Sequence, residues 1–183
     1  MNNTIIFTGS GGQGILSMGI MLAQSALEAG KFATFMPSYG PEQRGGSAKC
    51  TVIIGEEEIL SPMAGECEAL VAMSEVAYRK YIHELLPGGM LIYDNTMVTE
   101  PIKRTDISAI PIPAEDLALE IGSPKVANVI IDGVLVGLLG MVSPEDFRRC
   151  LEAKFANKSQ QVRDLNAKAL EKGLRLAKQH ILK

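Results

Sequence analysis

Short apolar runs alternate with amphipathic segments along the chain. Runs of β-branched, aromatic and other apolar residues predict strands at 4–8, 31–36, 69–73, 90–93 and 108–112. Apolar positions near a 3.6-residue period predict helices at 13–29, 75–86, 114–121, 125–140 and 160–182. Because strands and helices alternate, we expect an α/β fold: a three-layer α/β/α sandwich around a mixed, mostly parallel sheet.

Turn and capping residues add detail to this outline. Segments 47–54 and 57–60 have the pattern of two strands joined at Gly55-Glu56, which predicts an antiparallel hairpin and makes the sheet mixed. Pro87-Gly88-Gly89 is expected to end helix 75–86. Ser143-Pro144-Glu145-Asp146 is typical of a helix start, with Ser143 as the N-cap. No repeat or linker interrupts the pattern, so we expect one domain over residues 1–183.

Composition excludes several classes of function. A net charge of -3, 5% aromatic residues and no Trp argue against a nucleic-acid partner. The three cysteines lie at long spacings, which indicates free thiols in a reducing compartment. Because no Cys-x-x-Cys occurs, we expect this chain to hold neither a metal site nor an iron–sulfur cluster. The N-terminus lacks a signal-peptide pattern, and the most apolar stretch, 126–142, is interrupted by Asn128 and Asp132. We expect a cytoplasmic protein without a membrane span.

The first candidate site is the motif TGSGGQG, which follows the first strand and opens the first helix. Its candidate ligand-binding residues are Gly9, Ser10, Gly11, Gly12, Gln13 and Gly14. Glycines let the backbone approach a ligand, and the N–H groups of the helix N-terminus favour an anion. No acid lies between Glu28 and Glu42 to bind a ribose, which argues against NAD. The motif also lacks the Lys-Ser/Thr ending of a P-loop, and a tight turn without a ligand remains open.

The second candidate site is the motif PSYGPEQRGGSAKC. It adds Tyr39, Glu42, Arg44, Gly45 and Gly46 as candidate binding residues, and the planar fork of Arg44 suits a phosphate or a carboxylate. An ordinary loop in which Glu42 pairs with Arg44 or with solvent remains the alternative. Because both motifs follow consecutive parallel strands, we expect them to border one cavity at the same edge of the sheet.

The remaining reactive residues are isolated, and we predict no catalytic residue on this chain. His83 and His180 have no ligand-spaced neighbours. Cys50 lacks a base partner, so we interpret it as a buried structural thiol. Asp94 follows a strand near the expected ligand edge, where capping the next loop is the favoured interpretation.

The two motifs together, continued by TVIIGEEEILSP, resemble the gamma subunit of 2-oxoacid:ferredoxin oxidoreductases. The resemblance extends over nearly the whole chain, including Asn128, Gly137 and the segment 166–173. The form PSYGPEQRGG is more similar to the 2-oxoglutarate type than to the pyruvate type, while branched-chain and indolepyruvate enzymes share related motifs. An independent nucleotide-binding dehydrogenase is the alternative from another class.

The resemblance implies an accessory subunit. Such complexes convert a 2-oxoacid, coenzyme A and oxidised ferredoxin into acyl-CoA, carbon dioxide and reduced ferredoxin. Thiamine diphosphate, magnesium and iron–sulfur clusters are then expected on the alpha, beta and delta partner subunits. This chain is expected to be inactive alone, to shape the complex and to help bind coenzyme A.

Overall fold

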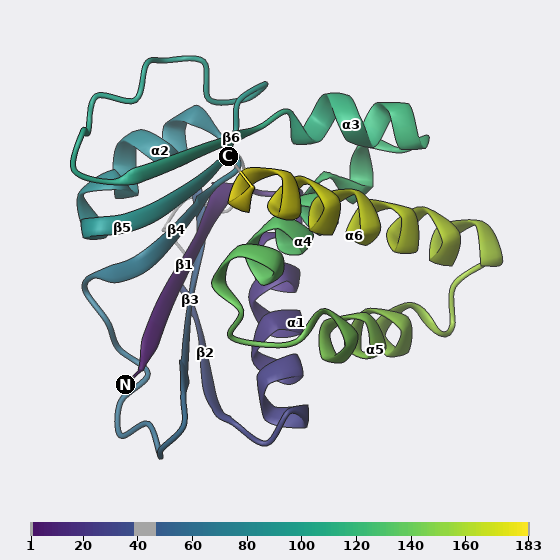
Figure 1. Ribbon diagram of the computed structural model, residues 1–183, viewed down its shortest axis with the longest axis horizontal. Coiled ribbons are helices and arrows are strands. Elements are labelled where there is room, and N and C mark those ends of the chain that lie inside the picture. The colour runs from purple at the N-terminus through teal and green to yellow at the C-terminus, as the bar shows by residue number, and fades with distance from the viewer. Residues whose placement is uncertain (1, 39–46, 183) are drawn as a thin grey trace.

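One mixed sheet organises the chain (Figure 1). The structure is a computed structural model that describes residues 2–38 and 47–182. The strands are β1 (Asn3–Ser10), β2 (Phe32–Ser38), β3 (Ser47–Gly55), β4 (Cys67–Ala72), β5 (Leu85–Asp94) and β6 (Ser108–Ile112). They are ordered β2-β3-β1-β4-β5-β6, with β1, β4, β5 and β6 parallel and β3 antiparallel to both of its neighbours. The predicted mixed, mostly parallel sheet is confirmed.

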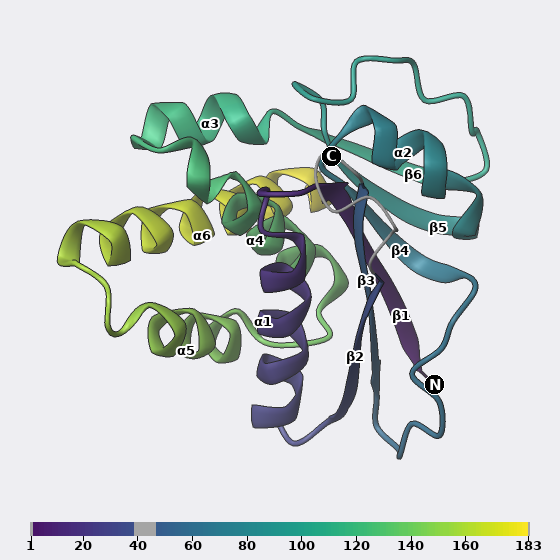
Figure 2. The ribbon, with the colours of Figure 1, turned by 180° about the vertical axis from the view of Figure 1, so that it is seen from behind.

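Helices cover both faces of the sheet, as the two opposite views show (Figures 1 and 2). The helices are α1 (Ile15–Glu28), α2 (Glu75–Tyr81), α3 (Ala114–Ile121), α4 (Ala127–Leu139), α5 (Pro144–Phe155) and α6 (Gln160–Ile181). Two 3₁₀ turns, η1 (Ile82–Glu84) and η2 (Pro124–Val126), complete the described elements. Helix α2 lies on one face and α1 and α4 on the other, with α5 and α6 packed outside them. None of these helices is both long and apolar enough to cross a bilayer.

Alternation of side chains along the strands creates two hydrophobic layers. In β1, Ile5 and Phe7 face the layer formed with α1 and α4, whereas Ile6 faces the layer under α2. All three side chains are fully buried. Since both faces of the central strands are covered, these strands are apolar throughout rather than alternating.

Helices α4 and α6 pack with their backbones in close contact. A Cβ atom on Gly173 would lie 2.1 Å from the carbonyl oxygen of Ile130, and one on Gly133 would lie 2.6 Å from that of Leu170. Glycine therefore permits this crossing. Most residues of α4 are buried, in agreement with its apolar sequence.

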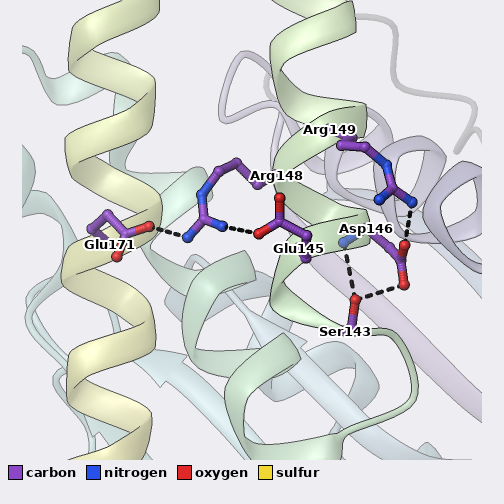
Figure 3. Close-up of polar contacts among 6 residues, drawn as sticks. All are labelled: Ser143, Glu145, Asp146, Arg148, Arg149 and Glu171. Carbon is purple, nitrogen blue, oxygen red and sulfur yellow. Dashed lines mark hydrogen bonds and ion pairs between the residues drawn. The ribbon is translucent and has the colours of Figure 1, made fainter.

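Polar contacts fix the start of α5 and join it to α6 (Figure 3). The Oγ atom of Ser143 accepts a 3.0 Å hydrogen bond from the backbone N–H of Asp146, which confirms the predicted N-cap. Arg148 then contacts Glu145 at 2.6 Å and Glu171 on α6. These exposed ion pairs orient the outer helices and add little stability.

The predicted hairpin at 47–60 is wrong. Residues 47–55 form β3, but 57–60 form no strand, and Leu60 is 94% exposed. Strand β3 pairs with β1 along one edge and with β2 along the other. Because both edges are occupied, no third strand can pair with β3.

The predicted helix 75–86 ends too late. Helix α2 ends at Tyr81, and Leu85 already pairs with Cys67 of β4. The register then shifts before Ala69 pairs with Met90, so Pro87-Gly88-Gly89 lies in an irregular part of β5 instead of ending a helix. Such an irregularity accommodates proline and glycine in a strand.

Candidate functional site

The glycine motif forms a tight turn that connects β1 with α1. The side chain of Gln13 holds this turn: its Oε1 atom accepts a 2.7 Å hydrogen bond from the N–H of Ser10, and its Nε2 atom donates a 2.8 Å bond to the carbonyl of Met73. Met73 directly follows β4, so the turn is tied to the neighbouring strand. Gln13 and the Ser10 amide therefore have structural partners within the turn.

The turn depends on glycine at two positions. Gly12 and Gly14 have φ values of 94° and 78°, a region that other residues rarely adopt. Gly14 is the N-cap of α1 and makes no side-chain cap, and the first turn of α1 contains no acid. Within the described residues, the N–H groups of Gly14, Ile15 and Leu16 have no acceptor. The turn therefore presents unpaired donors at the positive end of a helix.

The turn, through Gly12, Gln13 and Gly14, borders a cavity of about 380 Å³ at the carboxyl edge of the parallel strands. Its wall combines the glycine turn with the residues after β4 and β5 and with the N-terminal ends of α3 and α4. The contributors besides the turn include Met73, Asp94, Glu115, Lys125 and Asn128. The cavity thus lies at the sheet edge where open α/β folds bind ligands.

Asp94 is a structural residue of this cavity. Its carboxylate is only 1% exposed and accepts bonds from the N–H and hydroxyl of Thr96 and from the N–H groups of Ala114 and Glu115. The last two bonds cap the N-terminus of α3. The predicted capping role is confirmed, and it extends across the chain to a helix twenty residues later.

Asn128 and Lys125 are cavity residues that sequence reasoning did not assign as binding residues. The Nδ2 atom of Asn128 lies 2.4 Å from the place where a Cβ of residue 14 would be, so Gly14 is also required by this contact. The Oδ1 atom accepts a 2.9 Å bond from the N–H of Val129. One signal was available: Asn128 begins an otherwise apolar helical stretch. Nothing local indicated that Lys125 would lie beside the glycine turn.

The glycines predicted as binding residues in the first motif differ in their exposure in the fold. Gly11 and Gly12 are exposed on the turn, whereas Gly9 is buried in β1. A Cβ atom on Gly9 would lie 2.6 Å from Ile15 and 2.9 Å from Met73, so this glycine permits close packing behind the turn.

The second motif lies largely outside the described residues. Tyr39, Glu42, Arg44, Gly45 and Gly46 fall in this gap, so the cavity expected between the two motifs stays a prediction. The strands that flank the gap are described: Ser38 pairs with Lys49, and Lys49 also pairs with Thr8. The described strand ends that flank the second motif therefore lie at the same edge of the sheet as the glycine turn. The described end of β2 carries Ser38 instead of the acid typical of a dinucleotide site.

The isolated reactive residues match their structural interpretation. Cys50 is fully buried, and burial raises the pKa of its thiol to about 12, which suppresses the thiolate. His83 and His180 are exposed on η1 and α6. Over residues 2–38 and 47–182, no three His, Cys, Asp or Glu side chains gather into a metal-binding group.

Comparison with known families matches residues 4–176 to the family described as pyruvate ferredoxin/flavodoxin oxidoreductase. Among curated relatives, ketoisovalerate oxidoreductase subunit VorA of Methanothermobacter thermautotrophicus is 36% identical over 94% of this chain, which spans only 36% of that relative. The 2-oxoglutarate synthase subunit KorC of Methanocaldococcus jannaschii is 34% identical, with 98% of this chain and 96% of the relative covered.

Solved structures share both the fold and the sequence pattern. The gamma subunit of a keto/oxoacid ferredoxin oxidoreductase from Geobacter sulfurreducens has a TM-score of 0.83, 32% identity and coverage of 97% of this chain and 99% of its own. A 2-oxoglutarate:ferredoxin oxidoreductase from Magnetococcus marinus has a TM-score of 0.90 and 28% identity, covering 97% of this chain but 31% of its own. The chain therefore belongs to the pyruvate ferredoxin/flavodoxin oxidoreductase family, with the fold and length of a gamma subunit of 2-oxoacid:ferredoxin oxidoreductases.

Proposed function

We propose that this chain is the gamma subunit of a complex that oxidatively decarboxylates a 2-oxoacid with coenzyme A and ferredoxin. The observation that carries the proposal is the end-to-end correspondence with a separate gamma subunit, which covers 97% of this chain and 99% of that one. The products are acyl-CoA, carbon dioxide and reduced ferredoxin. Thiamine diphosphate, magnesium and the iron–sulfur clusters belong, in this proposal, to the alpha, beta and delta partners.

Within the complex, the glycine turn is proposed to bind the diphosphate of coenzyme A. The unpaired N–H groups of Gly14, Ile15 and Leu16 point from an acid-free helix start that borders a cavity. An anion at such a helix start is stabilised by ~0.3–1 kcal/mol at an exposed site. The Magnetococcus marinus relative was solved with coenzyme A bound, which supports this class of ligand.

For the substrate, we favour 2-oxoglutarate. The KorC relatives are 29% to 39% identical, and the chain covers 96% of one of them. Ketoisovalerate is the second candidate, because two VorA relatives are 36% identical. Relatives of the pyruvate and indolepyruvate types are 33% and 26% identical.

Purification of the native complex through a tag on this chain tests the function and the substrate. Coenzyme A-dependent reduction of ferredoxin is measured with 2-oxoglutarate, ketoisovalerate, pyruvate and indolepyruvate in separate reactions. We expect 2-oxoglutarate to give the highest kcat/KM. A higher value for ketoisovalerate would transfer the assignment to the branched-chain type, and no activity with any 2-oxoacid would refute the proposed function.

A pair of glycine variants tests the role of the turn. A Cβ atom on Gly11 or on Gly65 would meet no other atom within 4 Å, and neither residue has a positive φ. Gly11→Ala therefore adds a methyl group to the exposed turn, next to Gly12 of the cavity wall, without disturbing the described structure, and Gly65→Ala is the matched control. We expect only Gly11→Ala to raise the KM for coenzyme A in the complex. Unchanged kinetics in both variants would remove the turn from the coenzyme site.

A further inference from the structure

A polar cluster lies on the face of the sheet opposite the glycine cavity. Ser47 and Lys49 of β3 point toward α2, where Lys80 and Tyr81 meet them, and Glu84 of η1 completes the cluster. The Oγ atom of Ser47 lies 3.2 Å from the hydroxyl of Tyr81 and accepts a 3.1 Å bond from Nζ of Lys80. These residues come from two segments more than thirty positions apart, so tertiary folding alone assembles them.

The two lysines of this cluster have different partners. Lys49 forms an ion pair with Glu84, and the two side chains are only 12% and 14% exposed. Lys80 forms no ion pair within the described residues and contacts the Ser47 hydroxyl instead. Both Nζ atoms lie near the Tyr81 ring, 5.0 Å and 5.2 Å from its centroid. Among the described residues, two ammonium groups therefore share one carboxylate, and one positive charge is left over at Lys80.

The cluster also has hydrogen-bond donors to spare. A lysine ammonium has three N–H groups, and Lys80 uses one on Ser47. The Ser47 and Tyr81 hydroxyls contribute two O–H groups, of which their mutual contact uses one. In the described part of the chain, two N–H groups and one O–H group thus remain beside the excess charge. This combination suits a phosphate monoester, which carries about -1.5 to -2 charges near pH 7 and three acceptor oxygens.

The cluster lies within reach of a ligand on the glycine turn. Ser47 pairs directly with Ser10, the last residue of β1 before the turn. Directly paired antiparallel residues have Cα atoms about 4.5–5.5 Å apart. The turn faces the α1 and α4 side of the sheet, whereas the cluster faces α2. An extended ligand with two anionic groups can therefore cross the strand ends at Ser10 and Ser47.

We propose that Ser47, Lys80 and Tyr81 form a second anion subsite, which binds the ribose 3′-phosphate of coenzyme A while the glycine turn binds its diphosphate. This inference rests on the proposed function and deepens it. The diphosphate suits a row of backbone amides, and the more highly charged monoester suits an ammonium with adjacent hydroxyls.

Dephospho-coenzyme A, which lacks only the 3′-phosphate, provides the test. Calorimetric titrations of the full chain with coenzyme A, dephospho-coenzyme A and inorganic phosphate are compared for wild type, Lys80→Gln and Tyr81→Phe. The matched control is Lys168→Gln, which removes an exposed lysine from α6 on the other side of the sheet. Thermal unfolding checks that each variant is folded.

We expect wild type to bind coenzyme A about tenfold more tightly than dephospho-coenzyme A, the ratio for one charge-assisted hydrogen bond. Lys80→Gln should abolish this ratio, Tyr81→Phe should reduce it, and Lys168→Gln should preserve it. Equal binding of the two coenzymes by wild type overturns the subsite alone. Saturation of the cluster by inorganic phosphate with equal coenzyme affinities also overturns it, in favour of a free-phosphate site. If neither coenzyme binds wild type, the proposed coenzyme A role of this chain fails as well.

Discussion

Replacing Asp132 by leucine is expected to stabilise this protein at neutral pH. Asp132 lies on the apolar helix α4 and is fully buried, and neither carboxylate oxygen has a hydrogen-bond partner in the described structure. Leucine has the same branching and number of side-chain heavy atoms. It also has a higher helix propensity than aspartate. The substitution therefore removes two unpaired polar atoms while largely preserving the shape of the side chain.

The expected gain in the free energy of unfolding has one part that is independent of pH and one part that depends on pH. A buried polar group without a partner costs about 1–3 kcal/mol. Burial also raises the pKa of Asp132 well above its ordinary value of 3.8, and the charge of Lys154 only partly opposes this shift. Above pH 3.8 the unfolded chain therefore releases a proton that the folded chain retains. Folding stability then falls as the pH rises toward the native pKa, by at most about 1.4 kcal/mol per pH unit.

The assay is urea unfolding from about pH 4 to about pH 8, where this slope develops. At pH 7 we expect Asp132→Leu to raise the free energy of unfolding by about 1–3 kcal/mol or more and to flatten its pH dependence. Asp132→Asn should flatten the pH dependence with a smaller gain, because its amide stays buried. The matched control is Asp94→Ala, which removes an equally buried carboxylate that accepts four hydrogen bonds. This control should lose about 2–4 kcal/mol.

One result would refute the reasoning. If Asp132→Leu destabilised the protein at pH 7 while the pH dependence of wild type was retained, Asp132 would have a polar partner or hydration in the folded state. The contrast with Asp94 would then disappear, because both carboxylates would be paired. A loss of stability with a flattened pH dependence would instead indicate overpacking by the larger leucine.

Three further predictions concern packing, the second motif and the isolated chain. Gly173→Ala should lower the free energy of unfolding by at least about 1–3 kcal/mol, because its Cβ would meet the Ile130 carbonyl at 2.1 Å; Gly65→Ala, measured in the same urea titration, should have little effect. Arg44→Ala should raise the KM for coenzyme A or weaken assembly of the complex without changing the melting temperature. If the KM and the assembly both match wild type, Arg44 has no role in the site. The purified chain alone should not turn over 2-oxoglutarate. In dialysis it should bind neither iron nor thiamine diphosphate. Turnover of 2-oxoglutarate above a buffer control would contradict this prediction.

Most of the fold could be predicted from the sequence, because its signals are local. β-Branched residues and helical periodicity identified the strands and helices of an α/β sheet, and Ser143-Pro144-Glu145-Asp146 identified the start of α5. The glycine turn was equally readable, since the spacing of Gly9, Gly11 and Gly14 directly reflects backbone requirements. Sequence resemblance over nearly the whole chain also identified the family correctly.

The errors arose where partners distant in the sequence decide the outcome. Segment 57–60 had a local strand pattern, yet both edges of β3 were already paired with β1 and β2. Likewise, Leu85 left the helical pattern because it pairs with Cys67 in β4. A strand needs a free neighbouring edge, and local sequence does not contain that information.

The composition of the candidate sites was likewise decided by the tertiary structure. Only the fold brings Asn128 of α4 against Gly14, and Lys80 of α2 against Ser47 of β3. The fold also determines that Asp94 accepts four hydrogen bonds, while Asp132 is buried without a hydrogen-bond partner among the described residues. Local sequence therefore determined the elements and the backbone turn, because both depend on residues close together in the chain. The neighbours of each polar side chain depend on how distant elements pack, and only the tertiary structure decided them.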